Sequence, residues 1–197
     1  MTVKFQYNKS SLQGVEKQLK MRLRALPTIK SKESALRMEV KRAKDEAADL
    51  KRVLETQINA HDKMAALWNE FEPTLIAVRD VEISYRKIAG IRAPMLDGVV
   101  FDTQPFSLFN SPTWYMDGIA LLKTIARTGI EYELCFMKIN LLEHARKKTT
   151  QKVNLFEKVQ IPGFEDAIRK IKRFMEDEEN LSKSSQKIVK SKQESYG

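Results

Sequence analysis

The sequence contains little of what disulfide-stabilised, membrane-spanning or loop-rich proteins need. Among its 197 residues there are one cysteine, seven glycines and six prolines. The lone Cys135 excludes a disulfide within the chain and is typical of proteins in a reducing cytosol. The longest run without a charged residue, 103–116, is too short to span a bilayer, and no signal-peptide core is recognisable near residue 1. We therefore expect a cytoplasmic protein with no direct membrane insertion.

Motifs that position phosphates, metals or catalytic groups are also missing. No GxxxxGK loop or GxGxxG turn occurs, and His61 and His144 have no partner at the spacing of a zinc site. We assign no reaction to either histidine or to Cys135. The sequence therefore predicts a protein that is not an enzyme and has no catalytic residue, cofactor or metal.

Charged residues, by contrast, are abundant and unevenly distributed. They make up 31% of the chain, with a formal net charge of +9, which is typical of long helices whose sides face water. Residues 1–56 carry a net charge of +7, residues 57–145 carry −3 and residues 146–197 carry +5. If the two ends pair antiparallel, the two basic segments lie side by side.

An apolar repeat covers the N-terminal third of the chain. Apolar residues recur at alternating steps of three and four from Leu12 to Phe71, which is the pattern of a coiled-coil seam. The repeat keeps its phase through Pro27, and apolar residues at the same spacing continue it towards Gly90. The sequence thus predicts one helix over residues 9–89.

Two charged residues, Arg22 and Glu33, occupy positions of this first seam. Polar residues at such positions fix the register and the partner of a coiled coil at a cost in stability. We interpret both residues in this way and assign them no reaction.

A second apolar repeat follows Ser111 and Pro112, a pair that favours a helix start because serine caps free N–H groups and proline suits the first turn. The repeat runs to Phe156 and resumes after Pro162 with its phase shifted by one residue. Such a shift rotates the apolar stripe by about 100°. The sequence therefore predicts that the second helix changes its packing partner at Pro162-Gly163.

Residues 90–111, between the two repeats, contain few charges and many β-branched and aromatic residues around an Asp97-Gly98 turn signal. We predict a small β-hairpin there. The predicted fold class is all-α, a long antiparallel two-helix coiled coil with a small β-hairpin at a mid-chain foot.

The predicted organisation is a single elongated domain over residues 1–197. Its shaft would pair residues of about 9–60 with 160–192. Its foot would occupy about 61–159 and include the hairpin.

A family signature occupies residues 149–168, TTQKVNLFEKVQIPGFEDAI. This run resembles the C-terminal pattern of the D subunit of V-type and archaeal-type rotary ATPases. Its most specific part, V-N-x-x-E-x-x-x-I-P, is supplied by Val153, Asn154, Glu157, Ile161 and Pro162. The run departs from the family pattern at Thr150 and Gln151, which stand where the family has arginines.

Two further stretches resemble the same family. Residues 11–36 are similar to its first helix, and residues 90–94, GIRAP, are similar to the G-V-R-V-P that opens its mid-chain hairpin. The resemblance therefore spans nearly the whole chain.

The resemblance implies a central rotor shaft with no active site of its own. The expected partners are the catalytic A and B subunits around the shaft, the small F subunit of the stalk, and the coupling subunit (C or d type) of the membrane ring. The expected location is cytoplasmic and peripheral to the inner (plasma) membrane, within a membrane-bound complex. The direction of ATP turnover and the transported ion would be set by other subunits.

Three groups of residues are the candidates for these contacts. The expected seam of the shaft comprises Leu12, Leu19, Leu26, Ile168, Ile171 and Met175. The basic residues expected to face the ring are Lys17, Lys20, Arg24, Arg169 and Lys172. The expected interface of the foot comprises Trp68, Phe71, Trp114 and Tyr115.

Two other functions are compatible with the same pattern. A prefoldin-like chaperone or scaffold also joins two long helices through a β-hairpin. A basic coiled coil could instead bind nucleic acid, although few aromatic residues lie in the basic segments for stacking on bases. We therefore expect no nucleic-acid partner.

Overall fold

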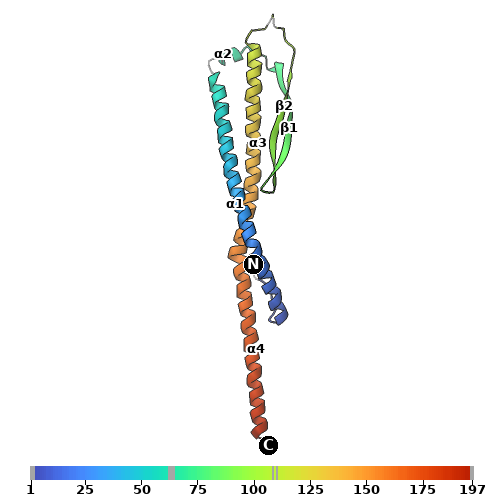
Figure 1. The fold of residues 1–197 in the computed structure, drawn as a ribbon, viewed down its shortest axis with the longest axis vertical. Coiled ribbons are helices and arrows are strands. Elements are labelled where there is room, and N and C mark those ends of the chain that lie inside the picture. The colour runs from blue at the N-terminus through green and yellow to red at the C-terminus, as the bar shows by residue number, and fades with distance from the viewer. Residues whose placement is uncertain (1–2, 62–64, 108, 110, 196–197) are drawn as a thin grey trace. The chain divides into compact units, whose positions relative to one another are not determined.

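The computed structural model describes residues 3–61, 65–107, 109 and 111–195. The chain divides into two compact units, one formed by 1–33 with 148–197 and the other by 34–147. The long helices and the central hairpin confirm the predicted fold class (Figure 1). The elements are α1 (Lys9–Ala60), α2 (Ala65–Trp68), β1 (Ile76–Ile88), β2 (Ile91–Thr103), α3 (Tyr115–Asn154) and α4 (Ile161–Ser195).

Helix α1 begins after Asn8, whose side-chain oxygen accepts a hydrogen bond from the Ser11 backbone N–H at 2.7 Å. Such a cap satisfies one of the free donors of the first turn. The helix continues through Pro27, as predicted, but ends at Ala60. The prediction of a helix reaching residue 89 is therefore wrong.

Residues beyond α1 fold differently because their β-branched and aromatic side chains favour an extended backbone. Pro73–Leu75 forms a short 3-10 turn, and β1 follows from Ile76 to Ile88. The apolar residues Val78 and Tyr85 fall at heptad steps by coincidence, since both lie in this strand. Pairing with β2 makes residues 76–88 a strand instead of a continuation of the helix.

Strands β1 and β2 pair antiparallel around Ala89-Gly90, with Ile88 opposite Ile91. Both turn residues have positive φ, 49° and 84°, and two-residue turns of this kind match the twist of paired strands. The hairpin therefore exists as predicted but occupies 76–103, and the predicted limits near 90–111 are wrong. The Asp97-Gly98 pair lies inside β2 instead of at its turn. Leu108 and Asn110 of the predicted range lie outside the described residues.

The core of the second unit lies between α1 and α3. It is formed by buried side chains that all fall on the predicted seams: Leu36, Val40, Ala43, Ala47, Cys135, Ile139 and Leu142. At the turn end of the hairpin, Ile88, Ala89 and Ile91 pack against this core. Figure 1 shows the hairpin beside α3. The structure thus packs α1 residues 36–47 against α3, while the predicted limits of shaft and foot remain a prediction.

A π-helical segment, Leu155–Gln160, connects α3 to α4. Its last hydrogen bond runs from the Ile161 N–H to the Phe156 carbonyl, five residues back, so the turn holds one residue more than an α-turn. The extra residue accounts for the one-residue change of phase in the apolar pattern. Pro162 follows in the first turn of α4 and, because it has no N–H, donates no backbone hydrogen bond back into the π-helical segment.

Candidate functional site

The first unit contains a helix pair built from the N-terminal part of α1 and from α4. Its buried core comprises Val15, Phe164, Ala167 and Ile171. Leu12, Leu19, Ile168 and Met175 are partly buried and pack against that core. Five of the six predicted seam residues are thereby brought together, and the sixth, Leu26, is half-buried farther along α1.

Polar contacts cross the same helix pair beside this core. The Arg22 guanidinium donates to Gln160 Oε1 at 2.8 Å and lies 4.5 Å from the centre of the Phe164 ring. Glu33 Oε1 accepts a hydrogen bond from Thr150 Oγ1 at 3.1 Å. Both seam polar residues therefore bond across the pair, and that these bonds fix its register remains a prediction.

The family-signature residues lie at the end of α3 and in the π-helical segment. Glu157 forms an ion pair with Lys30 at 2.8 Å. Ile161 is buried at the start of α4, next to Pro162, whereas Asn154 is exposed and Val153 half-buried. The signature thus marks the place where the helix changes geometry.

The predicted ring-facing basic residues are all exposed on the helix pair of the first unit. Steps of three and four place Lys17, Lys20 and Arg24 on one face of α1. On α4, Arg169 is exposed and Lys172 pairs with Glu16 at 3.2 Å. The side chains therefore offer a cationic surface without being held in a buried site.

Aromatic side chains gather in the second unit, near the start of α3. Trp68 lies 5.2 Å from Trp114, and Phe71 lies 5.3 Å from Tyr115, measured between ring centres. The Tyr115 hydroxyl donates to the Glu70 carbonyl at 2.6 Å. All four predicted foot residues thus form one cluster, in which edge-to-face packing adds to the effect of burial.

Gly118 allows this cluster to close. A Cβ atom at Gly118 would lie 2.9 Å from the Trp114 ring and 3.4 Å from Trp68, so the rings must shift to admit one. We expect Gly118→Ala to lower the free energy of unfolding by about 1–3 kcal/mol, the usual cost of overpacking. Denaturant unfolding followed by tryptophan fluorescence measures this change.

Gly129→Ala is the matched control, because position 129 lies on the same helix and a Cβ there meets no atom within 4 Å. Alanine favours a helix more than glycine does, so Gly129→Ala should raise the free energy of unfolding by about 0.5–1 kcal/mol. Equal stabilisation by Gly118→Ala and Gly129→Ala would contradict the packing described for the cluster.

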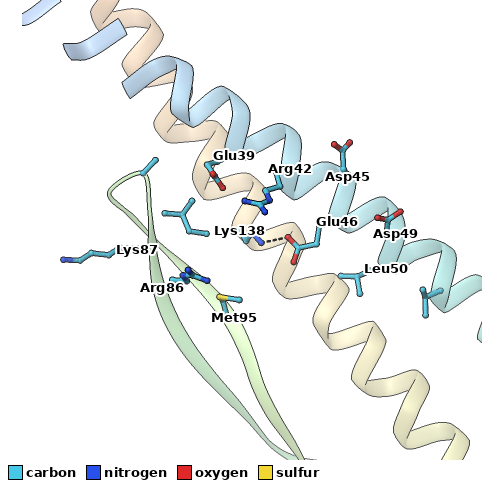
Figure 2. Close-up of a pocket in the computed structure, with 13 residues that line it drawn as sticks. Glu39, Arg42, Asp45, Glu46, Asp49, Leu50, Arg86, Lys87, Met95 and Lys138 are labelled. Carbon is cyan, nitrogen blue, oxygen red and sulfur yellow. Dashed lines mark hydrogen bonds and ion pairs between the residues drawn. The ribbon is translucent and has the colours of Figure 1, made fainter. Parts of the chain in front are cut away.

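A groove of about 890 Å³ lies in the second unit between α1, α3 and the turn end of the hairpin. Figure 2 shows Arg86 and Met95 of the hairpin on one side and Arg42 and Glu46 of α1 on the other. Sequence reasoning missed this groove because its walls come from segments far apart in the chain. Charges of both signs line it, unlike the mostly apolar pockets that bind small molecules.

Ion pairs connect α1 to α3 beside the groove. Lys138 Nζ lies 2.6 Å from Glu46, with the lysine side chain only 11% exposed, and Lys44 Nζ lies 2.6 Å from Glu143. The hydrogen bond from Lys44 lowers the pKa of the Glu143 carboxyl below its ordinary value. These contacts hold Lys138 and Lys44 beside carboxylates of the facing helix.

The single cysteine lies in the core of the second unit. Its Sγ donates to the Ala43 carbonyl at 3.3 Å, and burial raises the pKa of the thiol. Cys135 therefore lacks the exposed thiolate of a reactive cysteine.

Within residues 3–61, 65–107, 109 and 111–195, no group of three or more His, Cys, Asp or Glu side chains is placed to hold a metal ion. Over the same residues, no helix combines the length and apolarity needed to cross a membrane.

Comparison with known proteins gives one consistent result. The family model for the D subunit of ATP synthase matches residues 11–191 of the chain. A protein of Borreliella burgdorferi, named as the D subunit of V-type ATP synthase, is 29% identical, with 95% of this chain and 94% of that protein covered. Proteins of the same name from Chlamydia muridarum and Chlamydia trachomatis are each 28% identical, with 98% of this chain and 97% of each relative covered.

Proposed function

The chain belongs to the family of ATP synthase D subunits, and we propose that it is the central rotor shaft of a V-type ATPase or ATP synthase. In this role it transmits rotation between a ring of catalytic A and B subunits and the ion-translocating ring of the membrane. The family match over residues 11–191 is the observation that carries the proposal. The chain itself would catalyse no step, because ATP would be hydrolysed or made on the A and B subunits.

The first unit has the features that a shaft inside such a ring requires. Its antiparallel helices are held by an apolar core and by contacts that fix their register. The exposed cations Lys17, Lys20 and Arg24 would face the A and B subunits from one side of α1. Their attraction would be electrostatic and would weaken with salt.

The C-terminal part of α4 supports contact with the ring as well. Residues 176–195 are all exposed, and among them Leu181, Ile188 and Val189 each expose more than half of their surface. Leu181 and Ile188 are seven residues apart and therefore lie on one face of α4, with Val189 beside Ile188. We propose that this part of α4 is the bearing surface inside the ring.

The second unit would form the foot. We propose that the cluster of Trp68, Phe71, Trp114 and Tyr115 contacts the small F subunit and the coupling subunit of the membrane ring, since aromatic residues dominate the energetics of many interfaces. Such contacts would place the chain at the membrane surface as a peripheral part of the complex.

Purification of the intact complex tests this assignment. The chain, carrying a short affinity tag, is recovered from its native host in mild detergent, and its partners are identified by mass spectrometry. We expect A, B and F type subunits in fixed stoichiometry with the chain. A mixture of unfolded client proteins, as a prefoldin-like chaperone would retain, or nucleic acid would contradict the proposal.

Removal of residues 182–197 tests the bearing surface. We expect the truncated chain to remain folded, with a melting temperature within about 2 °C of the full chain, because exposed residues contribute little to stability. ATP-driven ion pumping by the complex should fall while ATP hydrolysis continues. Unchanged pumping per ATP would show that this part of α4 has no role in coupling.

A further inference from the structure

Two irregularities face each other in the helix pair of the first unit. Pro27 lies inside α1, and the π-helical segment 155–160 with Pro162 lies opposite. Contacts on both sides of Pro27 show that it lies opposite this segment, because Arg22 bonds to Gln160 and Lys30 bonds to Glu157. The two irregular segments therefore lie opposite each other in the helix pair.

Each irregularity weakens its helix. An interior proline cannot donate the hydrogen bond that residue 27 would otherwise make to the Leu23 carbonyl. In the opposite helix the π turn replaces the usual hydrogen bonds, and Pro162 removes another donor directly after it. Helices bend where such interruptions occur.

Packing offsets these losses only in part, because the seam residues of this stretch are at most half-buried. All of residues 16–33 and 148–160 are described, and none of their side chains is buried. The contacts that cross here include the exposed pair Lys30–Glu157, each side chain nearly half exposed, and exposed ion pairs contribute little stability. Within the first unit, the nearest buried side chains are Val15 on α1 and Ile161 on α4.

We propose that residues 22–30 of α1 and 155–162 form a flexible joint in the helix pair. At this joint the two helices open and twist locally, while the apolar core around Ile171 stays packed. The joint is a property of the chain alone.

Hydrogen exchange on the intact chain, resolved by mass spectrometry, tests the joint without any partner. Local opening of weakly packed segments exposes their amides to exchange. We expect amides of 23–31 and 155–161 to exchange roughly tenfold faster than those of 164–171. Equal protection in the three segments would overturn the proposal.

Pro27→Ala provides the decisive variant, because it restores the missing donor in a residue that favours helix. We expect it to slow exchange of 23–31 and also of the facing segment 155–161 by roughly threefold relative to 164–171. Gly14→Ala is the matched control, since position 14 is exposed on the same helix with no atom near its Cβ. If exchange of 155–161 does not change in Pro27→Ala, or changes as much in Gly14→Ala, the two irregularities are not coupled and the joint is refuted.

Discussion

Replacing Ile171 by alanine should lower the free energy of unfolding of the first unit by about 2–5 kcal/mol, the range observed for large buried side chains. Ile171 has no exposed surface and lies at the centre of the cluster that joins α1 to α4. The cavity left behind cannot be filled from a third layer, because the cluster is built from one helix pair and the segment preceding α1. Thermal unfolding followed by circular dichroism measures the loss, with hydrogen exchange of 9–21 and 164–175 to locate it.

Ile188→Ala is the matched control, because the same side chain is removed from the same helix at a position that is 58% exposed. Its effect should stay within about 0.5 kcal/mol. Comparable destabilisation by Ile171→Ala and Ile188→Ala would contradict the apolar core described for the first unit.

Leu142→Ala should have an effect of similar size in the second unit, about 2–5 kcal/mol. Leu142 is fully buried between α1 and α3, in the same cluster as Leu36. The neighbouring Leu141 is 44% exposed, so Leu141→Ala removes the same atoms one residue away. We expect Leu141→Ala to lower the free energy of unfolding far less than Leu142→Ala does.

Denaturant titration compares the two variants, and hydrogen exchange of residues 36–47 and 132–145 shows whether the loss falls in the second unit. Should Leu141→Ala prove as destabilising as Leu142→Ala, α3 must be rotated relative to the described packing. That result would also contradict the predicted seam, in which Leu142 and not Leu141 occupies a core position.

The helical pairing could be predicted because burial on a helix repeats with a simple period. The seam read from the sequence includes Val15, Leu36 and Ala43 on α1 and Cys135 and Leu142 on α3, and the structure buries all of them. The shift of phase at Pro162 coincides with the π-helical turn just before the proline. The predicted change of packing partner is wrong, because α1 contributes to the apolar core on both sides, with Leu36 beside α3 and Val15 beside α4.

The end of the first helix could not be predicted from periodicity alone. Val78 and Tyr85 fit the heptad spacing, although they lie in a strand. What decides their conformation is pairing with β2, a contact between segments that meet only in the folded chain. Gly90, expected beyond a helix end, instead follows Ala89 in the hairpin turn because both residues take positive φ there.

The candidate site could be predicted from the sequence only in part. Trp68, Phe71, Trp114 and Tyr115 could be selected as aromatic residues near the foot, and the structure brings them into one cluster. The groove beside the hairpin could not be selected, because it depends on how the hairpin lies against α1 and α3. Which of these surfaces contacts a partner remains a prediction.

Rotation of the chain against the ring of A and B subunits tests the central proposal most directly. Tyr85 is 68% exposed on β1, whereas the lone Cys135 is buried, so Tyr85→Cys provides a single reactive position for a bead. The unsubstituted chain, which should bind no bead, is the control. With the ring fixed to a surface, we predict continuous rotation of the bead in one direction when ATP is added; a bead that stays still while the complex hydrolyses ATP would contradict the rotor account.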